Sequence, residues 1–283
     1  MAFADAPDHH PPLHRLNLGF DWPSPTGPFG SLTDDQAASF DRDGFVVIEA
    51  AFTDEEIAAV REEIDRREQR VEDFLSGLED ERFGIAEAGA ITFTINLAHR
   101  SDLLREFVTH PVLLGLCRDL VGPDVDLYWD QAVYKKPEKP RRFPWHQDNG
   151  YTNVDPQYYL TCWIALTDAT TDNGCPVVAP GLHRYGTYEH TYVEPLGWQI
   201  FDEAPDPVAA PVKAGAIVVF SSLTPHMTGP NLSDSVRKAY IVQYSPAGAR
   251  IVSDDGGDST TSRAVGDEPH TFAVLRNGQR IAP

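Results

Sequence analysis

Between residues 124 and 246 the chain is a succession of short β-rich runs, broken by proline, glycine and asparagine, with no helical pattern between them. The clearest runs read VDLYWDQAVY, YYLTCWIALTDA, AIVVFSS and KAYIVQYSP. Runs of this length that are rich in β-branched and aromatic residues and bounded by turn residues are typical of strands. Because several of them follow one another directly, we predict a sandwich or jelly roll.

The region before these strands, residues 31–123, carries helical patterns. Two capping boxes, Thr33 with Gln36 and Thr53 with Glu56, predict helix starts. The second predicted helix has an apolar stripe at helical spacing, formed by Ile57, Val60 and Ile64. The run GFVVIEAAF between the two helices predicts a short strand, and HPVLLGLCRDLVG predicts a further helix.

These patterns predict one domain preceded by an arm. Residues 1–30 are rich in proline, histidine, glycine and aspartate and are expected to be irregular. The domain, residues 31–283, would comprise the helical part 31–123, a jelly-roll core 124–250 and a polar, loop-like segment 251–283. The arm's histidines could bind a metal, although a solvated tail is the commoner arrangement; they are His9, His10 and His14.

Charge and composition exclude several classes of partner. The formal net charge of −20 disfavours binding to nucleic acid or to an anionic membrane, so a small-molecule substrate is expected. The three cysteines match neither a zinc motif nor a disulfide framework, and the N-terminus lacks the apolar stretch of a signal peptide. No apolar run reaches membrane-spanning length. We expect a cytoplasmic protein, whose oligomeric state the sequence does not define.

The stretch FPWHQDNGY contains the first candidate metal ligands, His146 and Asp148. In an extended strand, residues two apart point to the same face, so both side chains would project inward. Alone, the pair is better explained as a polar patch where a strand enters a turn.

A third candidate ligand follows a later apolar run. His226 lies in a proline-flanked loop after AIVVF, and Arg237 follows eleven residues later at the head of the next strand. Two histidines and one carboxylate suit non-haem Fe(II) with open coordination positions, but zinc can take the same set. The planar fork of Arg237 favours iron, because it could hold the far carboxylate of a chelating 2-oxo acid such as 2-oxoglutarate.

Taken together, these blocks resemble the phytanoyl-CoA dioxygenase family of Fe(II)- and 2-oxoglutarate-dependent oxygenases. The resemblance covers about residues 35–246 and rests on FDRDGFVVIEAAFTDEEIAAVREEI, WHQDNGY, CWIALTDATTDNGCPVVAPGLH and KAGAIVVFSSLTPHMTGPNLSDSVRKAY, in that order. It implies a mainly β fold with flanking α-helices around a double-stranded β-helix, the cupin-like jelly roll.

The resemblance also implies a chemistry and a set of ligands. His146, Asp148 and His226 would bind Fe(II), and Arg237 would hold the 2-oxoglutarate C5 carboxylate. Trp163 would pack beside this cosubstrate. With O₂, the expected reaction is hydroxylation of a C–H bond with release of succinate and CO₂, and the iron itself is the catalytic group. Asp148 occupies the place that related halogenases leave open for a halide, which favours hydroxylation, although desaturation, epoxidation or cyclisation use the same triad.

Other residues near these motifs are weaker candidates. Gln131 and Lys135 alternate on one side of a predicted strand and could reach the 2-oxoglutarate carboxylates. Asn149, Tyr151 and His183 are candidates for the substrate pocket. Each of these residues could equally serve the fold alone, and Trp163 could be an ordinary core aromatic.

Two further functional classes remain open at this point. The barrel could belong to a binding protein that has lost catalysis, or to a zinc lyase or hydrolase with the same ligands. For an oxygenase, the acidic net charge and the lack of a Lys/Arg cluster make an acyl-CoA substrate less attractive than a small specialised metabolite.

Overall fold

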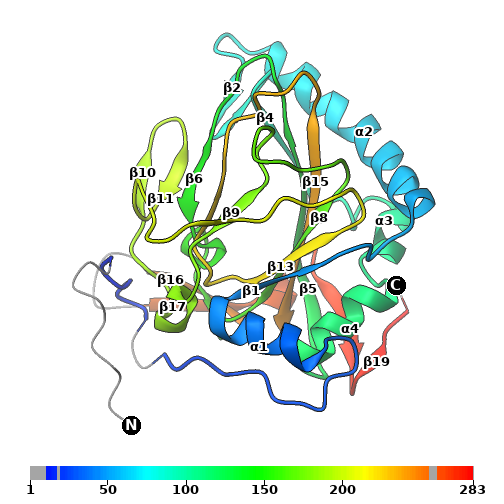
Figure 1. The fold of residues 1–283 in the computed structure, drawn as a ribbon, viewed down its shortest axis with the longest axis vertical. Coiled ribbons are helices and arrows are strands. Elements are labelled where there is room, and N and C mark those ends of the chain that lie inside the picture. The colour runs from blue at the N-terminus through cyan, green and yellow to red at the C-terminus, as the bar shows by residue number, and fades with distance from the viewer. Residues whose placement is uncertain (1–10, 18–19, 255–259, 283) are drawn as a thin grey trace.

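The fold is a jelly roll of antiparallel sheets with helices packed on one side (Figure 1). The computed structural model describes residues 11–17, 20–254 and 260–282. In Figure 1, helices α2, α3 and α4 lie to the right of β8 and β15, whereas β6, β9, β10 and β11 lie to the left. The predicted mainly β fold with flanking helices is confirmed.

The large sheet runs β1-β13-β8-β15-β5-β4-β3-β2, and the smaller opposing sheet runs β12-β9-β14-β6. The strands of the large sheet are β1 (Phe45–Ile48), β2 (Arg82–Phe83), β3 (Ala86–Glu87), β4 (Ile91–Ile95), β5 (Val125–Lys135), β8 (Leu160–Ala165), β13 (Ile217–Ser221), β15 (Arg237–Pro246), β18 (Phe272–Arg276) and β19 (Gln279–Arg280). Those of the smaller sheet are β6 (Phe143–His146), β9 (Pro176–Val178), β12 (Val208–Ala209) and β14 (His226–Thr228).

The remaining elements are two small sheets, the helices and three 3₁₀ turns. The small sheets contain β10 (Thr191–Val193) with β11 (Gly197–Gln199), and β7 (Val154–Asp155) with β16 (Arg250–Asp254) and β17 (Thr260–Ala264). The helices are α1 (Asp34–Asp43), α2 (Asp54–Ser76), α3 (Asp102–Phe107) and α4 (Pro111–Leu120). The 3₁₀ turns are η1 (Asp148–Gly150), η2 (Leu182–Tyr185) and η3 (Val265–Asp267).

Strand alternation divides the large sheet into a helix-facing side and an inward side. On β8, Cys162 and Ile164 belong to the core cluster that contains the helices, while Trp163 belongs to a second cluster on the inner face. On β15, Tyr240 belongs to the helix-facing cluster and Ile241 to the cluster on the inner face. Both faces are buried, which explains why these strands read as nearly continuous apolar runs.

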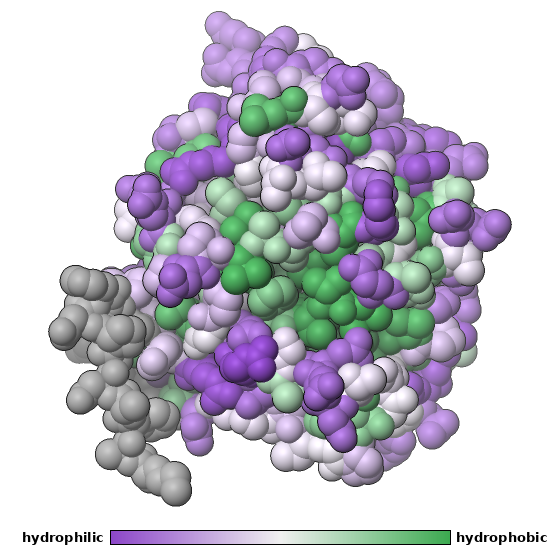
Figure 2. Space-filling model, viewed as in Figure 1, coloured by the Kyte–Doolittle hydropathy of each residue, from purple (hydrophilic) through white to green (hydrophobic). Residues whose placement is uncertain are grey.

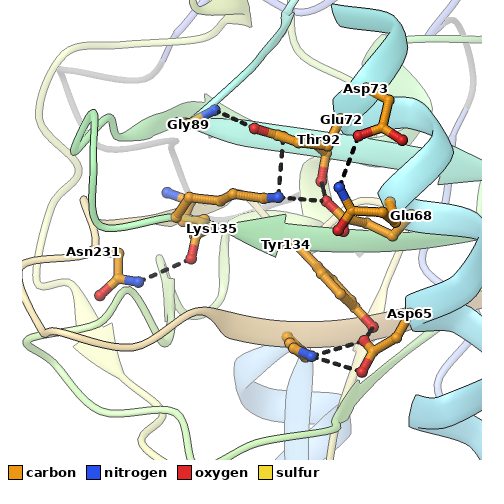
Figure 3. Close-up of polar contacts among 12 residues, drawn as sticks. Asp65, Glu68, Glu72, Asp73, Gly89, Thr92, Tyr134, Lys135 and Asn231 are labelled. Carbon is orange, nitrogen blue, oxygen red and sulfur yellow. Dashed lines mark hydrogen bonds and ion pairs between the residues drawn. The ribbon is translucent and has the colours of Figure 1, made fainter. Parts of the chain in front are cut away.

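The helices follow the local signals in the sequence. Both predicted capping boxes are confirmed, at the starts of α1 and α2. The stripe of α2 is buried, and this helix lies against β4. Its polar positions also bind the sheet: Glu68 and Glu72 both pair with Lys136 at 3.0 Å, and Asp65 accepts a hydrogen bond from Tyr134, as Figure 3 shows for the acidic residues of the helix.

Two regional predictions need correction. Residues 251–283 were expected to be polar and loop-like, but β18 pairs with β5 and extends the large sheet, with Val274 and Leu275 fully buried. The helical part also contributes β4, which pairs with β5 along its whole length. Both strands are too short, and too rich in charged or threonine neighbours, to give a strong pattern by themselves.

The described part of the arm contains no helix and contacts the loop after η2. Leu13 forms an isolated β-bridge with Tyr188, and the Asn17 side chain bonds to the backbone of Tyr185 and Thr187. His9 and His10 lie outside the described residues. His14 accepts a hydrogen bond from the Leu16 amide, and it is not part of any metal-binding group among the described residues.

The surface agrees with the composition. Figure 2 shows one face on which hydrophilic side chains occupy most of the rim, while hydrophobic side chains gather toward the middle. Within the described ranges, none of the helices is both long and apolar enough to cross a bilayer.

Gly44 is the residue that caps the C-terminal end of α1, and it packs against the loop before β14. Its φ of +81° is left-handed, and its carbonyl accepts a hydrogen bond from Thr224, two residues before His226. A Cβ at this position would lie 2.5 Å from His183 Nδ1 and 2.5 Å from Thr224 Oγ1. Glycine is therefore required both by the backbone conformation and by the space available.

We expect Gly44→Ala to reduce the free energy of unfolding by about 3 kcal/mol or more, because backbone strain and overpacking add. Gly84→Ala is the matched control, since Gly84 also has a positive φ (+58°) but no atom within 4 Å of the added methyl group. It should cost about 1 kcal/mol. Urea unfolding measures both; equal losses would show that the contacts with His183 and Thr224 are unimportant.

Candidate metal centre

The pairing of β6 with β14 brings two histidines together. His146 and His226 are direct partners in the antiparallel register, and their ring centroids lie 4.1 Å apart. Both side chains are buried. Two residues that lie 80 positions apart in sequence thus face the same space between the sheets.

Asp148 completes the group. It follows β6 at the start of η1, and its Oδ1 lies 3.7 Å from His146 Nε2 and 3.8 Å from His226 Nε2. The ligand atoms of the three residues lie within 4.8 Å of one another, and no other such group occurs in the part of the chain that the structure describes. The intervening Gln147 points the other way and bonds to Gly186 and Leu223.

Both histidines are oriented for metal binding. The Nδ1 atoms lie 2.9 Å from the Pro144 carbonyl and 3.0 Å from the Thr224 carbonyl, so each Nδ1–H can donate and leave the Nε2 lone pair free. Burial, followed by the neighbouring His226, lowers the pKa of His146 well below its usual value. His146 is therefore neutral at physiological pH, the state in which imidazole binds metals.

The carboxylate of Asp148 is held by a short polar chain. Its Oδ2 accepts a hydrogen bond of 2.6 Å from the Thr161 hydroxyl on β8, and Thr161 accepts one of 3.3 Å from the Gln243 amide on β15. Because Oδ2 is taken up by this hydrogen bond, Oδ1 is the oxygen that faces the two histidines. Two imidazole nitrogens and one carboxylate oxygen fit a first-row divalent metal with open positions.

Arg237 lies on the inner face at the start of β15 and is 1% exposed. Its Nη1 donates a long bond of 3.4 Å to the Val133 carbonyl, whereas Nε and Nη2 have no hydrogen-bond partner among the described residues. Burial lowers the pKa of Arg237 to about 9, so the side chain remains cationic at neutral pH. A buried cation with unpaired donors fits an anionic ligand.

Two cavities meet at the candidate ligands. The smaller, about 50 Å³, contains Arg237, Trp163 and His226 in its wall. The larger, about 440 Å³, is lined by Phe83, Ile85, Ala86, Phe93, Ile95, Tyr128, Trp129, Gln131, Phe143, His146, Asp148, Tyr151, Thr152, Tyr159 and Gln243. Both walls include His146 and Asp148. The candidate metal position therefore lies at the junction.

Three of the weaker candidates line these cavities. Trp163 faces the smaller cavity, with the Arg237 guanidinium 5.2 Å from its ring centroid. Gln131 borders both cavities, and Tyr151 borders the larger one.

Three other candidates lie apart from both cavities. Lys135 does face inward, as expected, but its Nζ donates to the carbonyls of Arg141, Thr228 and Gly229. Figure 3 shows the Asn231 side chain bonded to the backbone oxygen of Lys135. Asn149 is fully buried and bonds to Thr187 and Val154. His183 is fully buried against Trp22 and bonds to the Asp41 carbonyl. Their contacts indicate roles in the fold.

Two residues at the site were missed at the sequence level: Thr161 and Gln243. Thr161 lies two residues before Trp163 on β8, and Gln243 lies on the same inward row of β15 as Arg237. A polar residue at an inward position of an apolar strand is the signal that would have found each of them.

The comparisons with known proteins agree with this geometry. An ectoine dioxygenase from Bordetella bronchiseptica is 28% identical over 239 residues, which cover 76% of each chain. Two solved structures are also similar. The non-heme alpha ketoglutarate dependent carbocyclase SnoK from nogalamycin biosynthesis has a TM-score of 0.65 and 28% identity, covering 80% of this chain and 89% of that chain. The epimerase SnoN, in complex with Fe3+, alpha ketoglutarate and nogalamycin RO, has a TM-score of 0.63 and 25% identity, covering 77% and 85%.

The family model described as phytanoyl-CoA dioxygenase (PhyH) matches residues 40–239. The matched range is more than half of the chain and includes all three candidate ligands and Arg237. The chain therefore belongs to the phytanoyl-CoA dioxygenase family of iron- and 2-oxoglutarate-dependent oxygenases.

Proposed function

We propose that this iron- and 2-oxoglutarate-dependent dioxygenase hydroxylates a C–H bond of a small organic molecule. The balanced reaction converts substrate R–H, 2-oxoglutarate and O₂ into R–OH, succinate and CO₂. In this proposal His146, Asp148 and His226 bind the iron, and Arg237 binds the far carboxylate of 2-oxoglutarate.

The observation that carries the proposal is the buried, underbonded Arg237 beside the triad. Burying an unpaired cation costs several kcal/mol, about the penalty expected for one desolvated ion. A carboxylate that bonds to Nε and Nη2 would recover much of that cost through a bidentate pair. A zinc hydrolase has no need of such a cation, which favours the iron and 2-oxoglutarate assignment.

The two cavities support separate positions for cosubstrate and substrate. The smaller cavity contains the cation and suits 2-oxoglutarate, while the larger suits the molecule to be oxidised. When bound, the metal supplies O₂ activation coupled to decarboxylation of the 2-oxo acid. The protein orients both organic molecules at the metal and excludes water between the sheets.

The walls near the metal also support a substrate that is not acyl-CoA. The lining of the larger cavity contains no lysine or arginine, so the described residues offer no cationic partner for phosphate groups there. The similar proteins SnoK and SnoN are described as enzymes of nogalamycin biosynthesis, which favours a specialised metabolite. The three cysteines are free and buried, in support of the expected reducing cytoplasm.

The triad can be tested one ligand at a time. We expect His146→Ala, Asp148→Ala and His226→Ala each to abolish iron-dependent succinate formation, because each removes one of the three protein ligands. His99→Ala, which changes an exposed histidine, should retain activity and iron content. Full activity of the wild-type protein with zinc in place of iron would contradict the oxygenase assignment.

The role of Arg237 can be tested by binding of the cosubstrate. We expect Arg237→Leu to weaken 2-oxoglutarate binding about 100-fold, since two charge-assisted hydrogen bonds are lost. The readout is the visible charge-transfer band that forms on anaerobic addition of Fe(II) and 2-oxoglutarate. Lys238→Met is the matched control, because Lys238 pairs with Asp65 on the opposite face of β15. An unchanged 2-oxoglutarate requirement in Arg237→Leu would refute this role.

The polar chain behind Asp148 predicts an effect on metal affinity. We expect Thr161→Val to weaken Fe(II) binding by about tenfold or more, because Oδ2 of Asp148 loses its donor while the shape of the side chain is kept. Thr161→Ser, which retains the hydroxyl, should bind iron nearly as well as the wild type. Equal iron affinity in both variants would show that the hydrogen bond does not position the carboxylate.

A further inference from the structure

We infer that the substrate is an uncharged molecule with several fused aromatic rings that donates a hydrogen bond to the side-chain carbonyl of Gln243. This inference rests on the proposed function and specifies the class of molecule that the larger cavity accepts. It draws on the aromatic walls, the charges around them and the direction of the hydrogen bonds at Gln243.

Aromatic rings line the larger cavity in two contacting groups that come from different elements. In the first, Phe143 lies 5.8 Å from Phe93 and 6.3 Å from Tyr151 between ring centroids, the latter pair stacked. In the second, Tyr128 and Tyr159 meet edge to face at 5.0 Å. Flat rings offer offset-stacked and edge-to-face contacts to another aromatic system. Such contacts stabilise a complex beyond the burial of apolar area alone.

The first group directly borders the metal position. His146 contacts Phe143 at 4.7 Å and Tyr151 at 5.4 Å, both edge to face. A planar substrate held against these rings has its edge near the iron. The cavity volume, about 440 Å³, falls within the range of pockets that enclose a drug-sized ligand.

The outer end of the cavity also exposes an aromatic ring. Phe83, on the β2–β3 hairpin, is 71% exposed although it lines the cavity, and Phe74 of α2 lies 6.4 Å from it and is 57% exposed. The two rings together form an exposed apolar spot beside the cavity. Their position at the cavity suits the entry of an apolar, ring-containing molecule.

The cavity offers no charge to a charged substrate apart from the metal ligands. The lining contains no lysine, arginine or glutamate, and its tyrosines are phenols that are neutral at physiological pH. The arginines next to the lining are paired: Arg82 with Glu194 at 2.8 Å, and Arg141 with Glu87 at 2.8 Å. A sulfonate or phosphate in this space would have no free cation.

Gln131, Thr152 and three tyrosine hydroxyls also line the cavity, but Gln243 is the lining amide that bonds to the polar chain behind Asp148. The Asp148 carboxylate can only accept, so the Thr161 hydroxyl must give its proton to Asp148 and accept from Gln243. This order assigns the Gln243 amide nitrogen to Thr161 and leaves its Oε1 toward the cavity, where none of the described residues donates to it. An acceptor fixed in this way matches a hydroxyl or N–H group on the substrate.

Because Gln243 is connected through Thr161 to a metal ligand, the substrate's hydrogen bond also fixes its register relative to the iron. The distance from the donor group to the oxidised carbon is then set by a rigid chain of three side chains. Gln243 is thus a specificity-determining residue for the position of oxidation.

The test uses three-ring probes with the enzyme loaded with Fe(II) and 2-oxoglutarate under anaerobic conditions. Equilibrium dialysis gives the dissociation constants of 9-phenanthrol, its methyl ether, a phenanthrenesulfonate and the fully saturated perhydrophenanthrenol. We expect 9-phenanthrol to bind about tenfold more tightly than the ether, as for one buried hydrogen bond. The sulfonate and the saturated alcohol should both bind more weakly than 9-phenanthrol.

Variants assign the effect to Gln243. In Gln243→Leu the tenfold preference for the hydroxyl should disappear while the ether binds within about twofold of the wild type. Gln243→Asn, which keeps an amide but is too short to reach both partners, should also lose most of the preference. Gln69→Leu is the control, because Gln69 bonds to Asp73 on the outer surface of α2. Each variant must still form the 2-oxoglutarate charge-transfer band.

The inference is overturned if the wild type binds phenol and ether equally, if the sulfonate or the saturated alcohol binds best, or if the preference survives in both Gln243 variants. An enzyme that forms the 2-oxoglutarate band but binds none of the probes overturns the substrate class and leaves the proposed function standing. Absence of the band in the wild type overturns the proposed function, and this inference with it.

Discussion

The antiparallel pairing of β6 with β14 is the contact on which the site depends. It places His146 opposite His226, and the next inward residue after His146 is Asp148. A shift of one residue in this register would turn the ligands of one strand into the opposite face of the sheet. The register is held from both sides: Lys135 bonds to the carbonyls that follow His226, and Gln147 bonds to the Leu223 carbonyl that precedes it.

The second constraint is the row of inward positions on β15. Arg237, Ile241 and Gln243 alternate along one face, so a single strand supplies the cation of the smaller cavity, its apolar wall and the acceptor of the larger cavity. The outward residues of the same strand fill the core beneath the helices. Stability and function therefore share one strand but occupy opposite faces of it, which allows a polar inner row within a well-packed sheet.

Much of the fold and the candidate site could be predicted from the sequence, because both depend on short-range periodicity. The capping boxes, the apolar strands and the inward spacing of His146 and Asp148 are all local patterns. The bonding partners of Lys135, Asn149 and His183 could not be predicted, since they lie far away in the sequence, where no local pattern identifies them. The same limit explains the missed β18, because its pairing partner β5 lies more than 130 residues earlier in the sequence.

The β2–β3 hairpin lines the larger cavity but carries none of the candidate metal ligands. It supplies Phe83, Ile85 and Ala86 to the larger cavity, yet it lies at the end of the large sheet, and a methyl group added at Gly84 in its turn would meet no atom within 4 Å. The metal ligands lie on β6, β14 and η1, and Arg237 lies on β15. Insertions or exchanges in this hairpin can thus reshape the space offered to a substrate while the oxidising centre is preserved. The architecture separates the part that can diversify during evolution or engineering from the part that must stay constant.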